Sequence, residues 1–319
     1  MDLDHQEICH HLAKLMHSQD PEGKRAAQTF REAFDYVYNG AKTGRFRPEE
    51  LSKTELTHIG SLVEINLRRE FDGFISDGNK MDFSIDSYDV DCKYSKAPFG
   101  WSIPLETVGN FAMVCHADDY KSTWRLGFVF VDQEILNKGK NRDQKTTIRS
   151  AARDQIVWAW LDAPLPPNTL LHLDSRDVEM IFEPPSGQKR INNLFRIAQR
   201  QLIPRGVIET VAQQKDPMKR VRGNGGARSL LKKEGIVILG DYLSHRRIAE
   251  ELKLPVPVEG SFVSATLIKC DATYQGAFTW INGEYWRLGD SSEVQSEAPD
   301  LSISTNSHLE NSLMEKFEE

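Results

Sequence analysis

Residues 82–94 contain the side chains with the clearest chemical potential. Asp91 and Lys93 lie two positions apart in a run that alternates charged with less polar residues, so on a strand both side chains project from the same face. Polar turn residues lie between Asp82 and Asp91 and allow a hairpin that brings the two carboxylates together. Two close carboxylates repel each other, and a divalent cation is the natural way to keep both ionised.

These residues have the parts needed to hydrolyse a phosphodiester. That reaction needs a metal ion to polarise the phosphate and activate water, and a nearby cation to position the nucleophile or offset developing charge. Asp82, Asp91 and Lys93 supply these parts, and we predict that they act with Mg²⁺. The alternative is a solvated surface pair, because Asp and Lys neighbours on strands are commonly exposed.

A glutamate on a preceding helix is a candidate for a further metal ligand. Residues 57–71 have apolar side chains at 59, 62, 63, 67 and 71, which is a helical spacing. Glu64 falls at the edge of this apolar stripe and Glu70 near its middle. Helical spacing therefore does not choose between the two glutamates, and either can be a structural acid at a helix end.

The elements around these residues predict an α/β domain. Residues 5–40 have helical patterns, and residues 153–161 form a second helix-like run. Between them lie four segments rich in β-branched and aromatic residues, which we predict as strands over 81–85, 87–95, 110–117 and 124–132. Helix, several strands and then helix is the pattern of a mixed β-sheet.

A proline-rich stretch marks the clearest boundary in the chain. Three prolines fall in four positions between Ala163 and Asn168, where no helix can continue. The length of 319 residues suits two domains that each bury a core. We therefore predict a first domain over 1–162, a linker over 163–168, a second domain over 169–289 and an acidic disordered tail over 290–319.

The second half has the element order of a winged helix-turn-helix. A basic amphipathic helix over 184–203 is followed by short helical pieces over 204–214, 216–222 and 224–235 and by a strand over 236–239. Polar and basic residues in and around the proposed turn and recognition helix are the candidates for DNA contacts. They are Lys219, Arg220, Arg222, Asn224 and Arg228. The alternative is a solvated basic face.

The charge of the chain is unevenly distributed. The formal net charge is -7, yet residues 290–319 alone hold eight acids against one lysine. Between 186 and 253 the count is fifteen Lys and Arg against six Asp and Glu. Phosphate contacts dominate DNA affinity, so this basic stretch favours a double-stranded DNA partner.

Other sequence features bear on metal binding, disulfide bonds and cellular location. The four cysteines lie far apart without a C-x-x-C pair, which indicates neither a zinc site nor a disulfide framework. No stretch approaches the roughly 20 apolar residues of a membrane span, and the N-terminus has no secretory pattern. We therefore expect a protein of the bacterial cytoplasm that binds no membrane.

Several segments carry a resemblance to a known family. They are KTELTHIGSLVEINLRREF, MDFSIDSYDVDCKYS, GWSIP, LLHL, MKRVRGNGGAR and EGIVILG, in this order. Over about residues 40–265 the chain resembles the NaeI family of type II restriction endonucleases. The resemblance implies a restriction-endonuclease-like domain with an Asp and an Asp/Glu-x-Lys motif on a mixed sheet.

Carried over residue by residue, the resemblance implies a particular site. Asp82 matches the first acid, Asp91 and Lys93 match the D-x-K motif, and Glu64 in LVEI matches the helix glutamate in preference to Glu70. Cys92 points to the core on the alternation argument, so we expect its backbone carbonyl, and not its thiolate, to meet the metal.

The resemblance also implies how the protein works. The second half of family members resembles the DNA-binding domain of the catabolite activator protein, has been likened to topoisomerase folds, and binds a second copy of the recognition site as an effector. The implied enzyme is a homodimer that makes Mg²⁺-dependent double-strand breaks at a palindromic site. The alternatives are a nicking DNA-repair endonuclease and a DNA-binding regulator with a degenerate nuclease domain, and the presence of Asp82, Asp91 and Lys93 disfavours the regulator.

Overall fold

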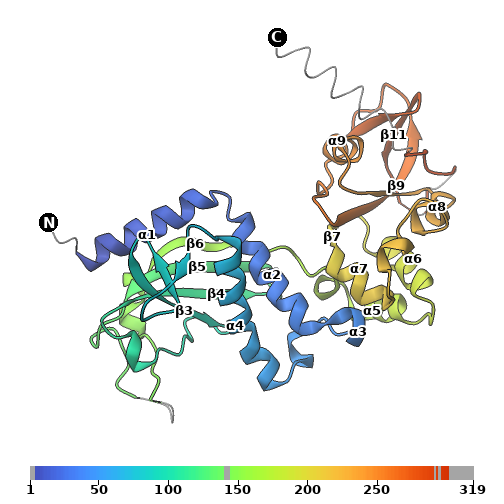
Figure 1. Ribbon diagram of the computed structural model, residues 1–319. Coiled ribbons are helices and arrows are strands. Elements are labelled where there is room, and N and C mark those ends of the chain that lie inside the picture. Colours follow the sequence, from blue (N-terminus) through green and yellow to red (C-terminus); the bar gives the residue numbers. More distant parts are fainter. Residues whose placement is uncertain (1–3, 140–143, 291, 294–295, 302–319) are drawn as a thin grey trace. The chain divides into compact units, whose positions relative to one another are not determined.

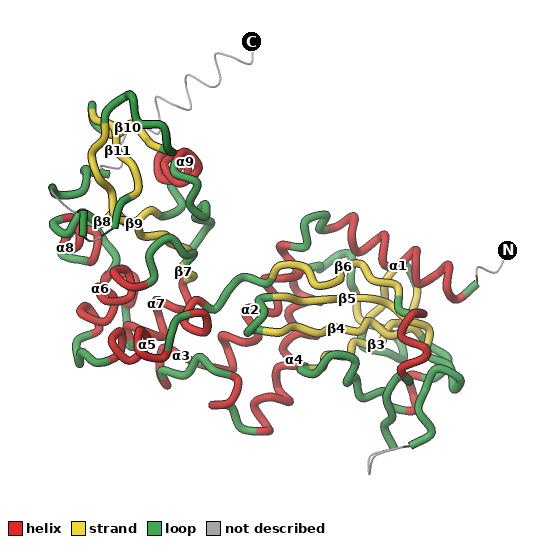
Figure 2. Tube along the Cα trace, turned by 180° about the vertical axis from the view of Figure 1, so that it is seen from behind, coloured by secondary structure: helices red, strands yellow, loops and turns green. Residues whose placement is uncertain are grey.

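The chain folds into two compact units. The computed structural model describes residues 4–139, 144–290, 292–293 and 296–301 (Figures 1 and 2). The first unit contains the chain up to Asn39 and then Arg45–Leu171, and the second contains Gly40–Gly44 and the chain from His172 onward. Within the described residues, no helix is long and apolar enough to cross a lipid bilayer.

The first unit is built on a six-stranded sheet in the order β1-β2-β3-β4-β5-β6. Only β3 and β4 pair in parallel, and every other neighbouring pair is antiparallel, so the mixed sheet predicted from the sequence is confirmed. The strands are β1 Ser76–Asp77, β2 Phe83–Ile85, β3 Tyr88–Ser95, β4 Phe111–Asp118, β5 Thr123–Phe130 and β6 Val157–Pro164.

Helices cover one face of this sheet (Figure 1). They are α1 His5–Gln19, α2 Lys24–Tyr38 and α4 Lys53–Glu70, which confirms the helices predicted over 5–40 and 57–71. Apolar side chains of all three helices form one core with alternate residues of the strands. Each large side chain that is fully buried there contributes about 1.5–3 kcal/mol. The opposite face packs against residues within 99–108, 131–139 and 144–156, which include the 3-10 helices η2 Leu105–Thr107 and η3 Ser150–Gln155.

The helix predicted over 153–161 is wrong, because most of this segment is the edge strand β6. Its valine and tryptophans favour an extended chain, and pairing with β5 outweighs the helix-like spacing. Pro164 ends β6 opposite Thr123, in the first part of the predicted 163–168 linker. Proline is tolerated here because an edge strand has no further neighbour that needs its missing N–H.

A short segment of the N-terminal half belongs to the second unit. Helix α3, Gly40–Thr43, packs against α7 of that unit. Left-handed residues flank it, with Asn39 at φ 48° and Gly44 at φ 73°, and such residues let the chain leave and re-enter the first unit sharply. Four helical residues cannot show a period of their own, so the sequence pattern did not reveal this excursion.

The second unit combines helices with a five-stranded sheet. Its helices are α5 Ser175–Phe182, α6 Gly187–Ile197, α7 Arg205–Ala212, α8 Ala227–Lys232 and α9 Leu243–Glu251, with the 3-10 helix η5 Pro217–Arg220. The 3-10 helix η4 Thr169–His172 lies where the chain passes from the first unit to the second. Its strands are β7 Ile203–Pro204, β8 Ile236–Leu239, β9 Ser261–Cys270, β10 Phe278–Ile281 and β11 Glu284–Leu288. The central β9 pairs with β8 along one edge and with β7 and then β11 along the other.

Residues 296–301 lie in the predicted disordered tail, but they pack against the rest of the second unit. Ala298 is 2% exposed, and its N–H donates to the carbonyl of Lys232 at 2.9 Å. The Lys232 ammonium pairs with Asp300 at 3.1 Å, and the Asn282 amide donates to the Asp300 carbonyl at 2.7 Å. Apolar Ala298 and Leu301 join a core cluster, which offsets the acidic composition of this stretch. Residues 302–319 lie outside the described residues.

Candidate active site

A tight hairpin brings the candidate metal-binding acids together. Asp86 and Ser87 have φ values of 48° and 70°, as a two-residue turn between twisted strands requires. The register pairs Ile85 with Tyr88 and continues to Phe83 with Val90. One more step along the two chains leads to Asp82 and Asp91, so the hairpin predicted from the sequence is confirmed.

The Lys93 ammonium is the point where the oxygens of the site converge. It contacts Asp91 Oδ1, lies 3.1 Å from the carbonyl oxygen of Cys92 and lies 3.5 Å from Asp82 Oδ2. Asp82 Oδ2 also accepts the Cys92 N–H at 2.8 Å. Two carboxylates and a carbonyl therefore surround one cationic group.

This donor set suits a hard divalent cation. Mg²⁺ takes oxygen ligands and is commonly held by one or two carboxylates, with water or substrate oxygens completing its shell. Among the described residues, no three His, Cys, Asp or Glu side chains form a metal site by themselves, and the Cys92 carbonyl is a further oxygen donor beside the two carboxylates. The Cys92 side chain is buried in the core, and its contact with Cys115 and its burial raise the pKa of its thiol well above the usual value.

The electrostatics of the site also favour a cation. Burial raises the pKa of Asp91, although its contacts with Lys93 and Thr107 oppose the shift. Burial and the nearby Asp82 carboxylate raise the pKa of Glu64. Burial disfavours the charged form of Lys93, but the contact with Asp91 and the charges of both aspartates outweigh it and raise the pKa of the ammonium. Negative charge is thus gathered where solvent screens it poorly.

Helix α4 positions Glu64 beside this group. The helix begins at a capping box in which the Ser52 hydroxyl accepts the Glu55 N–H at 3.3 Å and the Glu55 carboxylate accepts the Ser52 N–H at 2.8 Å. The Glu64 carboxylate interacts electrostatically with the two aspartates and with Lys93, and it forms an ion pair with Arg68 at 3.3 Å. Glu70 pairs instead with Arg25 at 2.7 Å.

Two residues near the acids were missed by the sequence analysis. Thr107 donates its hydroxyl hydrogen to Asp91 Oδ2 at 2.5 Å, and Arg68 bridges Glu64 and Asp77. The spacing of Arg68 from Glu64 is a helical i,i+4 pair and was a usable signal. No local pattern connects Thr107 with Asp91, because the two meet only through the parallel pairing of β3 and β4.

The candidate DNA contacts of the second unit divide by exposure. Lys219, Arg222 and Asn224 are exposed between α7 and α8, and Lys219 lies 3.5 Å from Asp216. Arg220 is half-buried, and its Nε donates to the Gln214 side chain at 2.5 Å. The first three side chains are therefore the ones presented to solvent.

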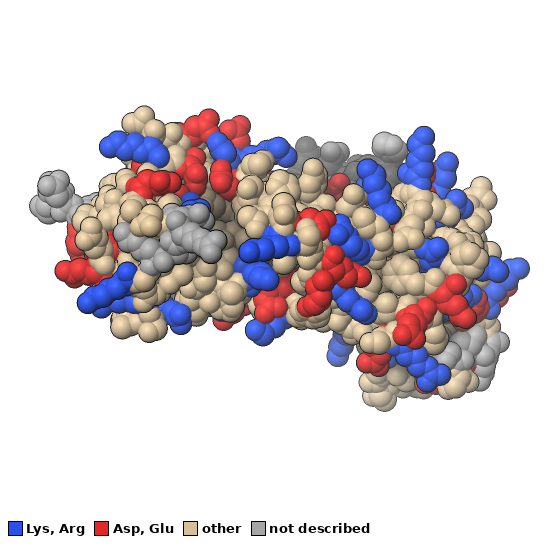
Figure 3. Space-filling model, turned by 90° about the horizontal axis from the view of Figure 1, so that it is seen from below, with Lys and Arg blue, Asp and Glu red and all other residues tan. Residues whose placement is uncertain are grey.

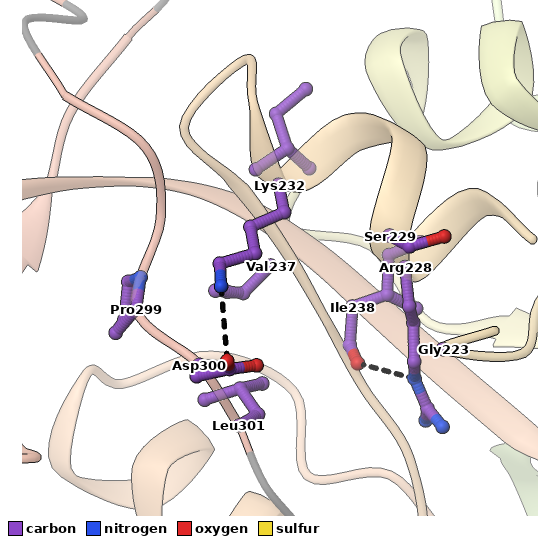
Figure 4. A pocket seen from close by; sticks show the side chains of 10 residues that line it. Gly223, Arg228, Ser229, Lys232, Val237, Ile238, Pro299, Asp300 and Leu301 are labelled. Carbon is purple, nitrogen blue, oxygen red and sulfur yellow. Dashed lines mark hydrogen bonds and ion pairs between the residues drawn. The ribbon is translucent and has the colours of Figure 1, made fainter. Parts of the chain in front are cut away.

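Arg228 points inward from α8. Its Nε donates to the carbonyl of Ile238 at 3.0 Å (Figure 4). Its guanidinium lies over the rings of Tyr242 and Phe262. Burial lowers the pKa of Arg228. The residue lines a hollow of about 230 Å³ that the Lys232–Asp300 pair also borders. Arg228 thus fastens α8 to β8 and does not project freely.

Acids interrupt the basic stretch over 186–253. On the face in Figure 3, Lys and Arg side chains alternate with Asp and Glu and form no continuous basic surface. Several basic residues of the second unit pair with acids of the same unit. These pairs are Arg196–Glu234, Arg205–Glu209, Arg246–Asp241 and Arg247–Glu251. The net charge of the stretch therefore does not correspond to a continuous basic surface on this face.

The fold and the site together fit the class of restriction-endonuclease-like nucleases. A mixed sheet presents two carboxylates and a lysine on one hairpin, next to a glutamate of a covering helix. The family model described as restriction endonuclease NaeI matches residues 10–296, and the chain belongs to this family. The match extends beyond residues 40–265, where the sequence motifs carry the resemblance.

A relative with a matching name agrees with this membership. The chain is 41% identical over 291 residues to the Type II restriction enzyme NaeI of Lentzea aerocolonigenes. The alignment covers 89% of this chain and 91% of that protein. The protein is therefore a type II restriction enzyme, a site-specific deoxyribonuclease.

Proposed function

We propose that the enzyme is a homodimer that makes Mg²⁺-dependent double-strand breaks at a palindromic DNA site. The observation that carries the proposal is the convergence of Asp82, Asp91 and the Cys92 carbonyl on the Lys93 ammonium. Glu64 completes the catalytic group from α4. The same oxygens that hold this ammonium are the ligands that Mg²⁺ prefers.

The proposed chemistry is hydrolysis of one phosphodiester bond in each active site. Asp82, Asp91 and the Cys92 carbonyl would hold Mg²⁺, which polarises the phosphate and makes water a better nucleophile. Lys93, whose ammonium lies beside both aspartates, would offset the negative charge that develops on the phosphate. The water oxygen bonds to phosphorus, the ester oxygen leaves, and one water proton passes to that leaving oxygen.

The proposal of a homodimer follows from the symmetry of the substrate. One site of this kind cuts one strand, and the two strands of a palindrome are related by a two-fold axis. Two copies related by the same axis place one active site on each strand. A monomer that nicks one strand and a regulator that cuts none are the alternatives, and cleavage of supercoiled plasmid distinguishes them by linear, open-circular or unchanged product.

We propose that the second unit is a winged-helix DNA reader for an effector copy of the site. The order α6, β7, α7, α8, β8, β9, with β9 between β7 and β8, supports this assignment. Residues 213–226 between α7 and α8 are longer than the turn of a simple helix-turn-helix and include η5. We place the DNA contacts at Lys219, Arg222 and Asn224, with Arg220 and Arg228 supporting this surface.

Substitution of an exposed arginine should weaken DNA binding without weakening the fold. Arg222→Ala removes one cation that is exposed in this surface, so the salt dependence of duplex binding should fall by about 0.9 in log–log slope if it meets one phosphate. Binding is measured by fluorescence anisotropy at several salt concentrations without Mg²⁺. As a control, Arg228→Met should chiefly lower the melting temperature, because its contact with Ile238 is internal. An unchanged slope in Arg222→Ala would contradict this surface.

Effector binding predicts different rates on one-site and two-site plasmids. If the second unit must hold a copy of the site, a one-site plasmid should be cut slowly, and short duplexes with the site should accelerate it by about 5–150-fold, the usual range of allosteric coupling. Initial rates with and without added duplex measure the effect, and a duplex of scrambled sequence is the control. Equal rates on both plasmids, with no response to duplex, would leave an enzyme without an effector site.

A further inference from the structure

Thr107 is hydrogen-bonded to the carboxylate of Asp91, although no sequence motif identifies this threonine. Its hydroxyl donates to Asp91 Oδ2 at 2.5 Å, and the residue is fully buried. The other oxygen of this carboxylate, Oδ1, contacts the Lys93 ammonium. Each oxygen of Asp91 therefore has its own partner, and rotation of the carboxylate would break both contacts.

The topology of the sheet explains why Thr107 reaches Asp91. Because β3 and β4 are parallel, the chain that leaves β3 at Ser95 must return to the other end of the sheet before it enters β4. The register pairs Val90 with Phe111, so the residues just before Phe111 arrive beside Asp91. Thr107 is the last residue of η2 on this return path.

The return path is held firmly on both sides of Thr107. Before it, the Trp101 indole donates to the Cys115 carbonyl at 2.7 Å. After it, the Gly109 N–H donates to the Val131 carbonyl at 2.7 Å, and the Val131 N–H donates to the Asn110 carbonyl at 2.9 Å. A hydroxyl fixed in this way has little freedom to move when Asp91 exchanges Lys93 for another cation.

We propose that Thr107 is a positioning residue, which holds Asp91 Oδ2 so that Oδ1 faces the metal. This inference rests on the proposed Mg²⁺ site. A carboxylate that binds metal through one oxygen needs a partner for the other, particularly in a buried place where water cannot supply one. Loss of such a partner commonly reduces metal affinity or activity by about 10- to 100-fold.

The choice of variants separates hydrogen bonding from packing. Thr107→Val keeps the branched shape but has no hydroxyl, whereas Thr107→Ser keeps the hydroxyl and loses a methyl group. If the hydroxyl matters, serine should behave like the natural enzyme and valine should not. If packing alone matters, serine should be the more damaging change because it leaves a small cavity. Thr107→Ala removes the hydroxyl with no shape conflict and replaces the valine variant should that variant unfold.

The experiment measures metal binding directly on the full chain. Free Mn²⁺ is followed by electron paramagnetic resonance during titration, and Asp91→Asn defines the part of the binding that belongs to this site. We expect Thr107→Val to weaken that part by about 10- to 100-fold and to raise the Mg²⁺ concentration for half-maximal cleavage by a similar factor, with Thr107→Ser near the natural enzyme. DNA binding without metal should be unchanged.

Two results have different meanings. Unchanged Mn²⁺ affinity in Thr107→Val, or equal weakening in Thr107→Val and Thr107→Ser, overturns the positioning role and leaves the metal site intact. Unchanged Mn²⁺ binding in Asp91→Asn instead overturns the proposed metal site itself. The two failures are therefore distinguishable in one set of titrations.

Discussion

Replacement of Asp91 by Asn should reduce double-strand cleavage by about 10³-fold or more and leave DNA binding in place. The change keeps the size of the side chain but removes the charge that Oδ1 presents beside Lys93. Metal assistance contributes several kcal/mol to such reactions, and about 4 kcal/mol corresponds to a thousandfold in rate. Single-turnover cleavage of plasmid with saturating Mg²⁺ measures the loss.

A matched control makes the result specific. Glu106→Gln removes an exposed carboxylate on η2, in the same unit, and should leave the cleavage rate within a few-fold of the natural enzyme because it lies on the surface. Lys93→Met should also abolish cleavage, because no ammonium remains to offset charge on the phosphate. It should keep Mn²⁺ binding, since both carboxylates stay. Cleavage near the natural rate in Asp91→Asn would place the catalytic site elsewhere.

The hairpin that carries the candidate active site was predictable because its determinants are local. Alternation around Asp91 and Lys93 fixes their common face, and a turn between two short strands brings Asp82 to them. Glu64 and Glu70 were not separable by spacing, since both lie on one helix. Their neighbours distinguish them, because Glu70 has Arg25 as partner while Glu64 lies near the aspartates.

The missed features depend on contacts between distant parts of the chain. Thr107 meets Asp91 only because β3 and β4 are parallel, and strand direction is not visible in either strand's sequence. Arg228 turns inward because Tyr242 and Phe262, from later segments, provide rings for its guanidinium. A basic residue on an amphipathic helix otherwise predicts exposure, so its local pattern favoured DNA contact.

A second large effect is expected at a buried ion pair that the sequence did not indicate. Arg31 on α2 bonds Asp119, just beyond β4, at 2.5 and 3.3 Å, and the Tyr38 hydroxyl donates to the same carboxylate at 2.9 Å. The side chains of Arg31 and Asp119 are 4% and 2% exposed. The pair therefore ties the middle of α2 to the sheet in a place where water screens little charge.

Asp119→Ala should destabilise the first unit by about 3–5 kcal/mol, because it leaves the Arg31 guanidinium buried without its main partner. Urea unfolding followed by tryptophan fluorescence reports on this unit, which contains Trp101, Trp124, Trp158 and Trp160 among the six tryptophans of the chain. Asp35→Ala is the matched control. It also contacts Arg31, at 3.0 Å, but its side chain is 40% exposed, so its loss should cost about 1 kcal/mol or less.

The double variant Arg31→Met, Asp119→Leu shows whether the loss of stability in Asp119→Ala comes from an unpaired buried charge or from lost hydrogen bonds. If the penalty in Asp119→Ala comes from stranding a charge, removal of both charges should restore much of the lost stability, since apolar replacements of buried pairs are often neutral or stabilising. If the double variant is as unstable as Asp119→Ala, the hydrogen bonds themselves, including that from Tyr38, hold α2 in place. In that case α2 is fastened to β4 by directed polar contacts, and the apolar core beneath α2 is insufficient to hold the helix there.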